Sequence, residues 1–166
     1  TAMLLPASLA ATRDLARKSC VLLKNQYDVL PLRPNTRIAL IGQLAGVQRD
    51  LNGSWDGKGR ERDAVSVRTA LEAAFPGKVT YVEGAKSAGS DKSGFAAAIA
   101  AAKRADVVVA VLGEGWYMSG EASSRTNLSI PGVQPELLAE LHKTGKPIVL
   151  VLFAGRPLTL APVLPD

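Results

Sequence analysis

Residues 107–132, VVVAVLGEGWYMSGEASSRTNLSIPG, change character half-way along their length. The stretch begins as an apolar, β-branched run, which is typical of a strand buried on both faces of a sheet. It then breaks into glycines, two glutamates, two aromatic residues and an arginine. In open α/β sheets, ligands bind beyond the carboxyl ends of the strands. The stretch therefore predicts a core strand that leads into a loop at a possible binding edge.

The rest of the chain supplies partners for this strand. Further short apolar runs predict strands over residues 36–44, 78–84 and 147–155. Apolar residues at helical spacing predict helices over residues 66–77, 93–105 and 134–145. This alternation predicts a mainly parallel sheet covered on both faces, which is a three-layer α/β/α sandwich.

The strand order decides which loops meet. In a flavodoxin-like order of 2-1-3-4, the first and third strands are neighbours beside the point where the order reverses. The glycine-rich segment 45–64, which we expect to be loop rather than helix, would then face the loop that carries Glu121. One crevice would lie between the two loops.

The two ends of the chain carry separate expectations. Residues 8–25 predict a helix that ends before two prolines, with Cys20 in its apolar stripe as a small buried hydrophobic residue. We divide the chain into an N-terminal helix and lead-in, residues 1–35, and an α/β sandwich domain, residues 36–166. The chain stops soon after the 147–155 run, so we expect a sheet truncated at its C-terminal end.

Composition and motifs argue against several function classes. The net charge is +5, but basic and acidic residues are interspersed, so we predict no nucleic-acid binding. No apolar stretch is long enough to span a membrane, and residues 1–18 lack the order of regions of a signal peptide. The segment GQLAG after the 36–44 run is neither a dinucleotide fingerprint nor a P-loop. A phospho-receiver would need acidic residues where this chain has Gly42, and an aspartate in place of Glu114.

Carboxylate and aromatic side chains remain. A glycosidase needs two carboxyl groups across the sugar, one as proton donor and one as nucleophile or base. The residues of the right kinds near the expected crevice are Glu114, Glu121, Trp55, Trp116 and Tyr117. A surface loop can carry two glutamates without any such function, so this pattern alone leaves the chemistry open.

A resemblance narrows the choice. Residues 107–141, together with the segments ARKSCVLLKNQYDVLPL, IALIGQLAG, NGSWDGKG and GKPIVLVLFAGRPL, resemble in order the second domain of glycoside hydrolase family 3, especially that of bacterial periplasmic β-glucosidases. The resemblance covers nearly the whole chain. It implies a domain of a retaining, exo-acting β-glucosidase that acts on terminal non-reducing β-D-glucosyl residues of a β-glucoside or oligosaccharide, in the periplasm or outside the cell.

In that family an N-terminal TIM-like barrel carries the catalytic aspartate nucleophile, and the second domain supplies the acid/base glutamate. By motif, the resemblance places the acid/base on Glu121 in SGEASSRT, and a sugar-binding aromatic ring on Trp55 in GSW. The nucleophile motif has no match here, so the resemblance implies half an active site and an inactive isolated chain. It predicts no cofactor and no metal. The alternative is a non-catalytic carbohydrate-binding or regulatory module of the same fold.

The other candidates keep two interpretations each. Trp116 and Tyr117 bind sugar or pin the loop to the domain, and Trp55 is a sugar platform or a packed loop residue. Glu114 supports the loop or is a plain strand-end carboxylate.

A cation beside a proton donor would favour the deprotonated form, so we expect Arg125 to point away from Glu121 and anchor the loop. We interpret Asp56 and Arg60 as solvated loop charges and His142 as a surface residue.

Overall fold

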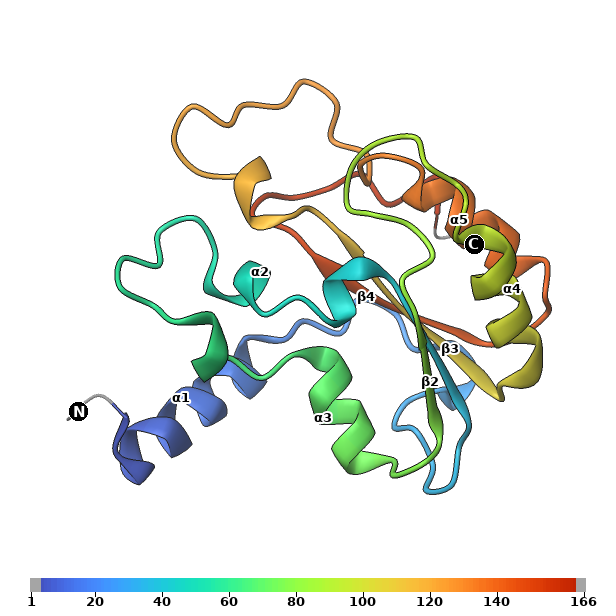
Figure 1. The fold of residues 1–166 in the computed structure, drawn as a ribbon, viewed down its shortest axis with the longest axis horizontal. Coiled ribbons are helices and arrows are strands. Elements are labelled where there is room, and N and C mark those ends of the chain that lie inside the picture. The colour runs from blue at the N-terminus through green and yellow to red at the C-terminus, as the bar shows by residue number, and fades with distance from the viewer. Residues whose placement is uncertain (1–3, 164–166) are drawn as a thin grey trace. The chain divides into compact units, whose positions relative to one another are not determined.

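The structure is a computed structural model that describes residues 4–163. It contains two compact units, Thr1–Pro31 and Leu32–Asp166. The second unit is an α/β domain built on one parallel sheet (Figure 1). Its strands are β1 (Ile38–Ile41), β2 (Val79–Val82), β3 (Val107–Gly113) and β4 (Ile148–Phe153).

The sheet has the predicted strand order. The order is β2-β1-β3-β4, and all three pairings are parallel. The register aligns Ile38 of β1 with Val79 of β2 on one side and with Val107 of β3 on the other. The first and third strands are therefore neighbours, and the loops that follow them leave the same edge of the sheet.

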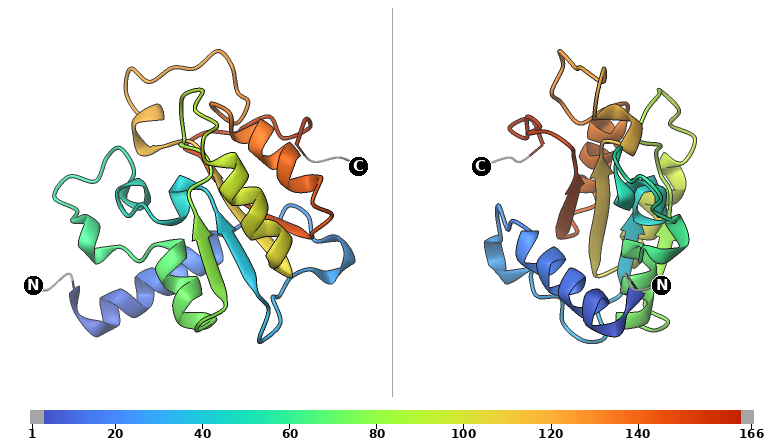
Figure 2. Two further views of the ribbon diagram at one scale, coloured as in Figure 1. Left: turned by 45° about the vertical axis from the view of Figure 1, so that its right-hand side comes forward. Right: turned by 90° about the vertical axis from the view of Figure 1, so that its left-hand side faces the viewer.

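Three helices complete the layers. They are α3 (Val67–Ala74), α4 (Phe95–Arg104) and α5 (Gln134–His142). Right-handed crossovers bring a helix to one face when the chain moves one way along the sheet and to the other face when it moves back. Accordingly α3 lies on one face and α4 and α5 on the other (Figure 2), and the predicted three-layer sandwich is confirmed.

The core lies mainly between the sheet and the α4–α5 layer. Alternate residues of β1 and β3 face this layer, and alanines on α4 let the helix approach the sheet closely. The main buried members are Ala39, Ile41, Val108, Ala110, Leu112, Ala98, Ala102, Leu137 and Leu141. Every residue of β3 is buried, as its apolar run predicts.

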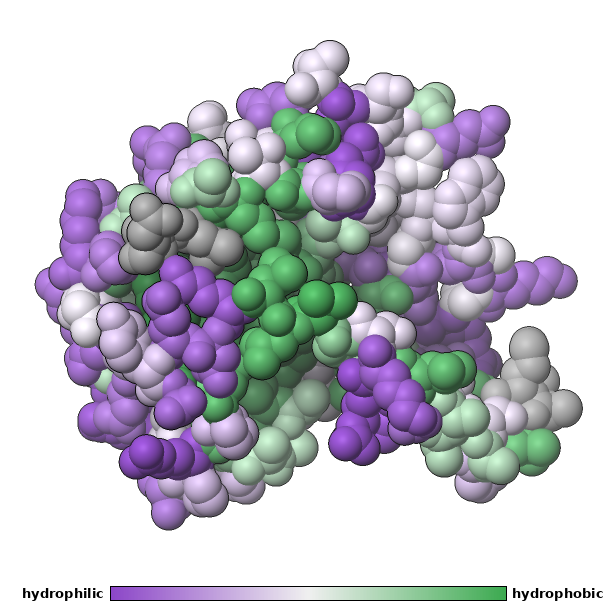
Figure 3. Space-filling model, turned by 180° about the vertical axis from the view of Figure 1, so that it is seen from behind, coloured by the Kyte–Doolittle hydropathy of each residue, from purple (hydrophilic) through white to green (hydrophobic). Residues whose placement is uncertain are grey.

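β4 is one of the two edge strands, opposite β2, and it is only half buried along its whole length. The view from behind (Figure 3) shows apolar residues gathered across the middle of the side that faces away from the viewer in Figure 1. An apolar strand with an unpaired edge favours pairing with other chains.

Gly113 ends β3 at a point where only glycine fits. Its φ is +129°, and an added Cβ would stand 1.9 Å from the carbonyl oxygen of Phe153 on β4. The chain can therefore turn out of the sheet directly before Glu114 while β4 stays in close contact. The backbone N–H of Glu114 still donates to the Phe153 carbonyl at 2.8 Å.

The first unit corrects two predictions. Helix α1 spans Pro6–Ser19 and not residues 8–25: the backbone is extended from Cys20, and Asn25 then binds both backbone groups of Leu30 and holds residues 25–30 in a turn. Cys20 follows α1 in extended conformation and is exposed, so the prediction of a buried cysteine was wrong. The apolar stripe that suggested burial is exposed too, since α1 has no buried residue.

The glycine-rich loop also contains more helix than predicted. A short helix α2 (Arg49–Asn52) and the 3-10 turn Glu61–Asp63 interrupt it, and the 3-10 turn Gln43–Ala45 precedes it where the strand had been predicted to continue. The four residues of α2 contain no glycine, so the glycines limit the helix at Gly53 without preventing it. Among the described residues, no helix has the length and apolar character to cross a membrane.

Candidate functional site

The loops after β1 and β3 meet at the carboxyl edge of the sheet, as the strand order predicts. They enclose a hollow of about 230 Å³. Its lining includes Trp55 from the first loop and Trp116, Tyr117 and Glu121 from the second. The structure thus brings the candidate proton donor and all three candidate aromatic residues together.

Two side chains of the first loop fasten the second. The Ser54 hydroxyl lies 2.5 Å from the carbonyl oxygens of both Trp116 and Ser119. The Asp50 carboxylate accepts a hydrogen bond of 2.7 Å from the backbone N–H of Trp116. Gly120 has a φ of +110°, and an added Cβ would stand 3.0 Å from the Ser54 Cβ. Gly120, the residue before Glu121, therefore packs so closely against the first loop that a larger residue would not fit without a shift.

The aromatic residues differ in how firmly they are held. The Trp116 ring packs under the Arg49 guanidinium at 4.1 Å, and it meets the Tyr117 ring edge to face with centroids 6.1 Å apart. Trp116 thus pins the loop and still lines the hollow. Trp55 is 74% exposed, which argues against the alternative of a packed loop tryptophan. Such a ring offers an open face on which a sugar can stack.

Glu114 is the buried charge of the site. Its side chain is only 1% exposed, and it forms ion pairs with both Arg125 and Arg156. Arg125 also donates to the Ser129 carbonyl at 3.1 Å. Arg156 also donates to the carbonyls of Ser123, at 2.7 Å, and of Met118. A buried carboxylate is tolerated when cations and hydrogen bonds compensate its lost hydration, and both are present here.

Glu121 is exposed at the tip of the loop, and the next residue, Ala122, has a positive φ of 59°. Arg125 makes its contacts with Glu114 and Ser129, at the base of the loop. The two glutamates therefore differ sharply. Glu114 is paired with two arginines inside the domain, and Glu121 is exposed to solvent beside aromatic rings.

The remaining candidates lie in ordinary surroundings. Asp56 forms an ion pair with Arg49 at 2.8 Å, and Arg60 pairs with Asp63 at 2.7 Å. His142 is exposed at the end of α5. Within residues 4–163 no cluster of three or more histidine, cysteine, aspartate or glutamate side chains could hold a metal ion.

Comparison with known proteins agrees with this geometry. The model of the glycosyl hydrolase family 3 C-terminal domain matches residues 20–166. The chain belongs to this family. It is 42% identical to the periplasmic β-glucosidase of Salmonella typhimurium and 37% identical to a β-xylosidase of Formosa agariphila, over 89% of the chain in each case.

Solved structures of the family have the same fold. The β-glucosidase of Listeria innocua, solved in complex with isofagomine, covers 97% of the chain with a TM-score of 0.90 at 35% sequence identity. The chain spans 22% of that protein, and 22% and 21% of the two sequence relatives. These relatives are thus much longer than the chain, which corresponds to one domain of them.

Four residues of this family 3 domain have roles that the sequence alone did not reveal: Asp50, Ser54, Gln134 and Arg156. The Gln134 side chain is almost fully buried, accepts from the Gly113 N–H at 2.9 Å and donates to the Gly113 carbonyl at 2.9 Å. It takes the place of a strand on the β1 side of Gly113, because β1 pairs only as far as Ala110 while β4 pairs with Gly113 on the other side. Arg156 lies in the segment GRPL, whose resemblance to the family was the one available signal.

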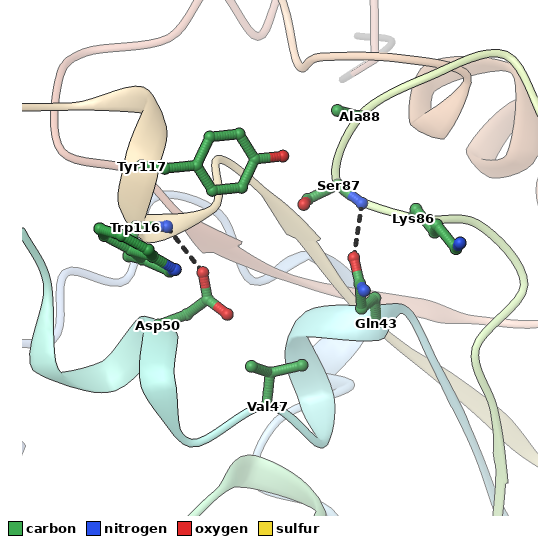
Figure 4. A pocket seen from close by; sticks show the side chains of 8 residues that line it. All are labelled: Gln43, Val47, Asp50, Lys86, Ser87, Ala88, Trp116 and Tyr117. Carbon is green, nitrogen blue, oxygen red and sulfur yellow. Dashed lines mark hydrogen bonds between the residues drawn. The ribbon is translucent and has the colours of Figure 1, made fainter. Parts of the chain in front are cut away.

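A second hollow of about 400 Å³ lies on the other side of the aromatic pair. Trp116 and Tyr117 line both hollows and form the wall between them. The opposite wall is polar (Figure 4), where the Ser87 N–H donates to the Gln43 side-chain oxygen at 2.9 Å. The aromatic pair therefore shapes the whole carboxyl edge of the sheet between β1 and β3.

Proposed function

We propose that this domain carries the general acid/base, Glu121, of a retaining exo-acting β-glucosidase that removes terminal non-reducing β-D-glucosyl residues. The observation that carries the proposal is the position of Glu121. It is an exposed carboxylate at the tip of an anchored loop, beside an exposed tryptophan, on an open hollow of about 230 Å³. The β-glucosidase names of several relatives support the substrate class, and the β-xylosidase among them makes xylosides the nearest competitor.

In this mechanism the chain supplies half of the catalytic groups. An aspartate of a TIM-like barrel, to which residues 1–35 are the lead-in, attacks the anomeric carbon. Glu121 donates a proton to the departing glycosidic oxygen, and its carboxylate then removes a proton from the water that hydrolyses the glycosyl-enzyme. Trp55, with Trp116 and Tyr117, contacts the sugar beyond the cleaved bond, while Glu114 and Arg125 support the loop. We place the enzyme in the periplasm or outside the cell, as for the Salmonella typhimurium relative.

The proton-donor role is tested by leaving-group dependence in the intact enzyme. Glu121→Gln should lower kcat/KM for phenyl β-glucoside by roughly 10²–10⁴-fold, the usual contribution of a general acid. For 2,4-dinitrophenyl β-glucoside, whose leaving group departs without a proton, kcat/KM should change little. Glu140→Gln, on the exposed face of α5, is the matched control and should leave both values unchanged.

Equal losses on both substrates would contradict the acid role. The 166-residue chain alone should hydrolyse no aryl β-glucoside, because the nucleophile belongs to the barrel. Turnover by the pure chain that Glu121→Ala abolishes would refute the two-domain mechanism. An intact protein that binds glucosides while no variant at Glu121 alters hydrolysis would favour the non-catalytic binding module.

A further inference from the structure

Arg156 contacts both arms of the loop that carries Glu121. It comes from the turn after β4, outside the loop, and its guanidinium reaches across the loop's base. One nitrogen of the guanidinium, Nη2, donates to the carbonyls of both Met118 and Ser123. These carbonyls stand three residues before Glu121 and two residues after it. One side chain therefore joins the two arms of the turn that presents Glu121.

The position of Arg156 is itself fixed. Its Nε donates to Glu114, whose side chain is 1% exposed and is also paired with Arg125. The preceding residue packs against the loop, because an added Cβ on Gly155 would stand 2.3 Å from the Ser119 hydroxyl. The Thr159 N–H then donates to the Leu128 carbonyl at 2.8 Å. Segment 155–159 thus follows the loop along its length.

Guanidinium geometry is needed for this set of contacts. A planar fork can donate to a carboxylate from one nitrogen and to carbonyls from another at the same time. A lysine ammonium in the same place is a compact point charge with a different geometry, so it cannot reach all three acceptors. Loss of the bridge leaves the two arms joined only by longer contacts, from the Ser123 N–H to the Gly120 carbonyl at 3.3 Å and from the Ser123 hydroxyl to the Tyr117 carbonyl at 3.5 Å.

We propose that Arg156 is a positioning residue for the proton transfer by Glu121. The inference rests on the proposed acid role of Glu121. Arg156 holds Met118 and Ser123 at a fixed separation, and thereby holds the Glu121 carboxylate at the distance from the glycosidic oxygen that proton transfer requires. Misplacement of a catalytic group by 1 Å costs on the order of 10²-fold in rate.

The test measures Arg156→Lys in the intact enzyme on the same two substrates. kcat/KM for phenyl β-glucoside should fall roughly 10- to 100-fold, while the value for 2,4-dinitrophenyl β-glucoside falls less than about threefold. Because both values come from one sample, their ratio does not depend on the fraction of folded enzyme. Arg156→Gln, which keeps an amide donor but no charge, should give the same selective loss. Arg104→Lys on the surface of α4 is the control and should change neither value.

A double variant separates this inference from the function on which it rests. In the Glu121→Gln background, Arg156→Lys should cause less than about a twofold further loss on phenyl β-glucoside, because the two residues act through one step. Equal losses on both substrates in Arg156→Lys, or losses that multiply in the double variant, would overturn the positioning role alone. Absence of leaving-group selectivity in Glu121→Gln itself would overturn the proposed function.

Discussion

Removal of the Glu114 carboxylate should strongly destabilise the domain, by an amount that its contacts allow us to calculate. The side chain is 1% exposed and accepts hydrogen bonds from Arg125 and Arg156. A hydrogen bond to a charged group contributes about 1.5–3 kcal/mol. Both arginines keep backbone carbonyl acceptors after the change, so we take the lower value for each. Glu114→Ala should therefore lower the free energy of unfolding by about 3 kcal/mol.

The cluster of Glu114, Arg125 and Arg156 has one anion and two cations, so loss of the anion should cost more stability than loss of one cation. Glu114→Ala leaves two cations, each with its side chain 20% exposed, without a counter-charge. Arg125→Ala leaves Glu114 paired with Arg156, so it should cost only about 1.5 kcal/mol. The double variant Glu114→Ala/Arg125→Ala should lose about 1.5 kcal/mol less than the sum of the single variants, because both single changes remove the same interaction.

Urea unfolding followed by circular dichroism measures these differences. The matched control is Arg68–Glu72, an exposed pair of the same residue types on α3 with an N–O distance of 2.8 Å. Its coupling energy should be no more than about 0.5 kcal/mol, since exposed helical pairs contribute little. A loss below about 1 kcal/mol in Glu114→Ala, or additive losses in the double variant, would refute the account of Glu114 as the buried anchor.

Two further predictions concern stability elsewhere in the domain. Gln134→Leu should lower the free energy of unfolding by about 2–3 kcal/mol, because it leaves the buried N–H and carbonyl of Gly113 without their partner. An unchanged midpoint of urea unfolding would contradict this prediction. Hydrogen bonds from the side chain and backbone of Arg37 hold the pKa of Asp106 well below its usual range. A pKa that is lowered in the folded state stabilises the protein at pH values above the pKa of the unfolded state, which is about 3.9 for aspartate. Wild type should therefore be more stable than Asp106→Asn from pH 5 to 8. The difference in stability should shrink as the pH falls below about 4. A difference that grows under acid conditions would show the opposite sign of linkage.

Most of the fold could be predicted from the sequence, because its strands are short apolar runs separated by helices with conventional ends. Parallel strands buried on both faces need nearly continuous apolar residues, and β3 is buried at every position. The order β2-β1-β3-β4 is the expected flavodoxin-like one, although the alternation of strands and helices does not by itself fix it. Boundaries were harder to predict where side chains compete for the backbone. Asn25 holds a turn between residues 25 and 30 through contacts with Leu30, where the periodic pattern had predicted helix as far as residue 25, and periodicity contains no signal for such contacts.

The site was predictable in composition and position, but not in its connections. Strand order brings Trp55 and Glu121 to one edge, and the aromatic and acidic residue types fit a sugar site without determining its chemistry. The partners of Glu114 lie 11 and 42 residues away along the chain. Contacts over such separations depend on how the loop segments pack, and no spacing rule applies to them. The acid/base role proposed for Glu121 comes from the resemblance, because neither burial nor periodicity can indicate such a role.

The loop after β3 is firmly held at its base and open at its tip. Ser54 and Asp50 bind it from the β1 side, Arg156 binds it from the β4 side, and Glu114 lies beneath it. Glu121 is exposed beyond all of these contacts. A proton donor that acts on a substrate bound mainly by another domain needs this combination, since its carboxylate must project outward while its backbone stays fixed. In the proposed mechanism, the contacts of Ser54, Asp50 and Arg156 fix the backbone of this loop and thereby hold the Glu121 carboxylate toward the glycosidic oxygen.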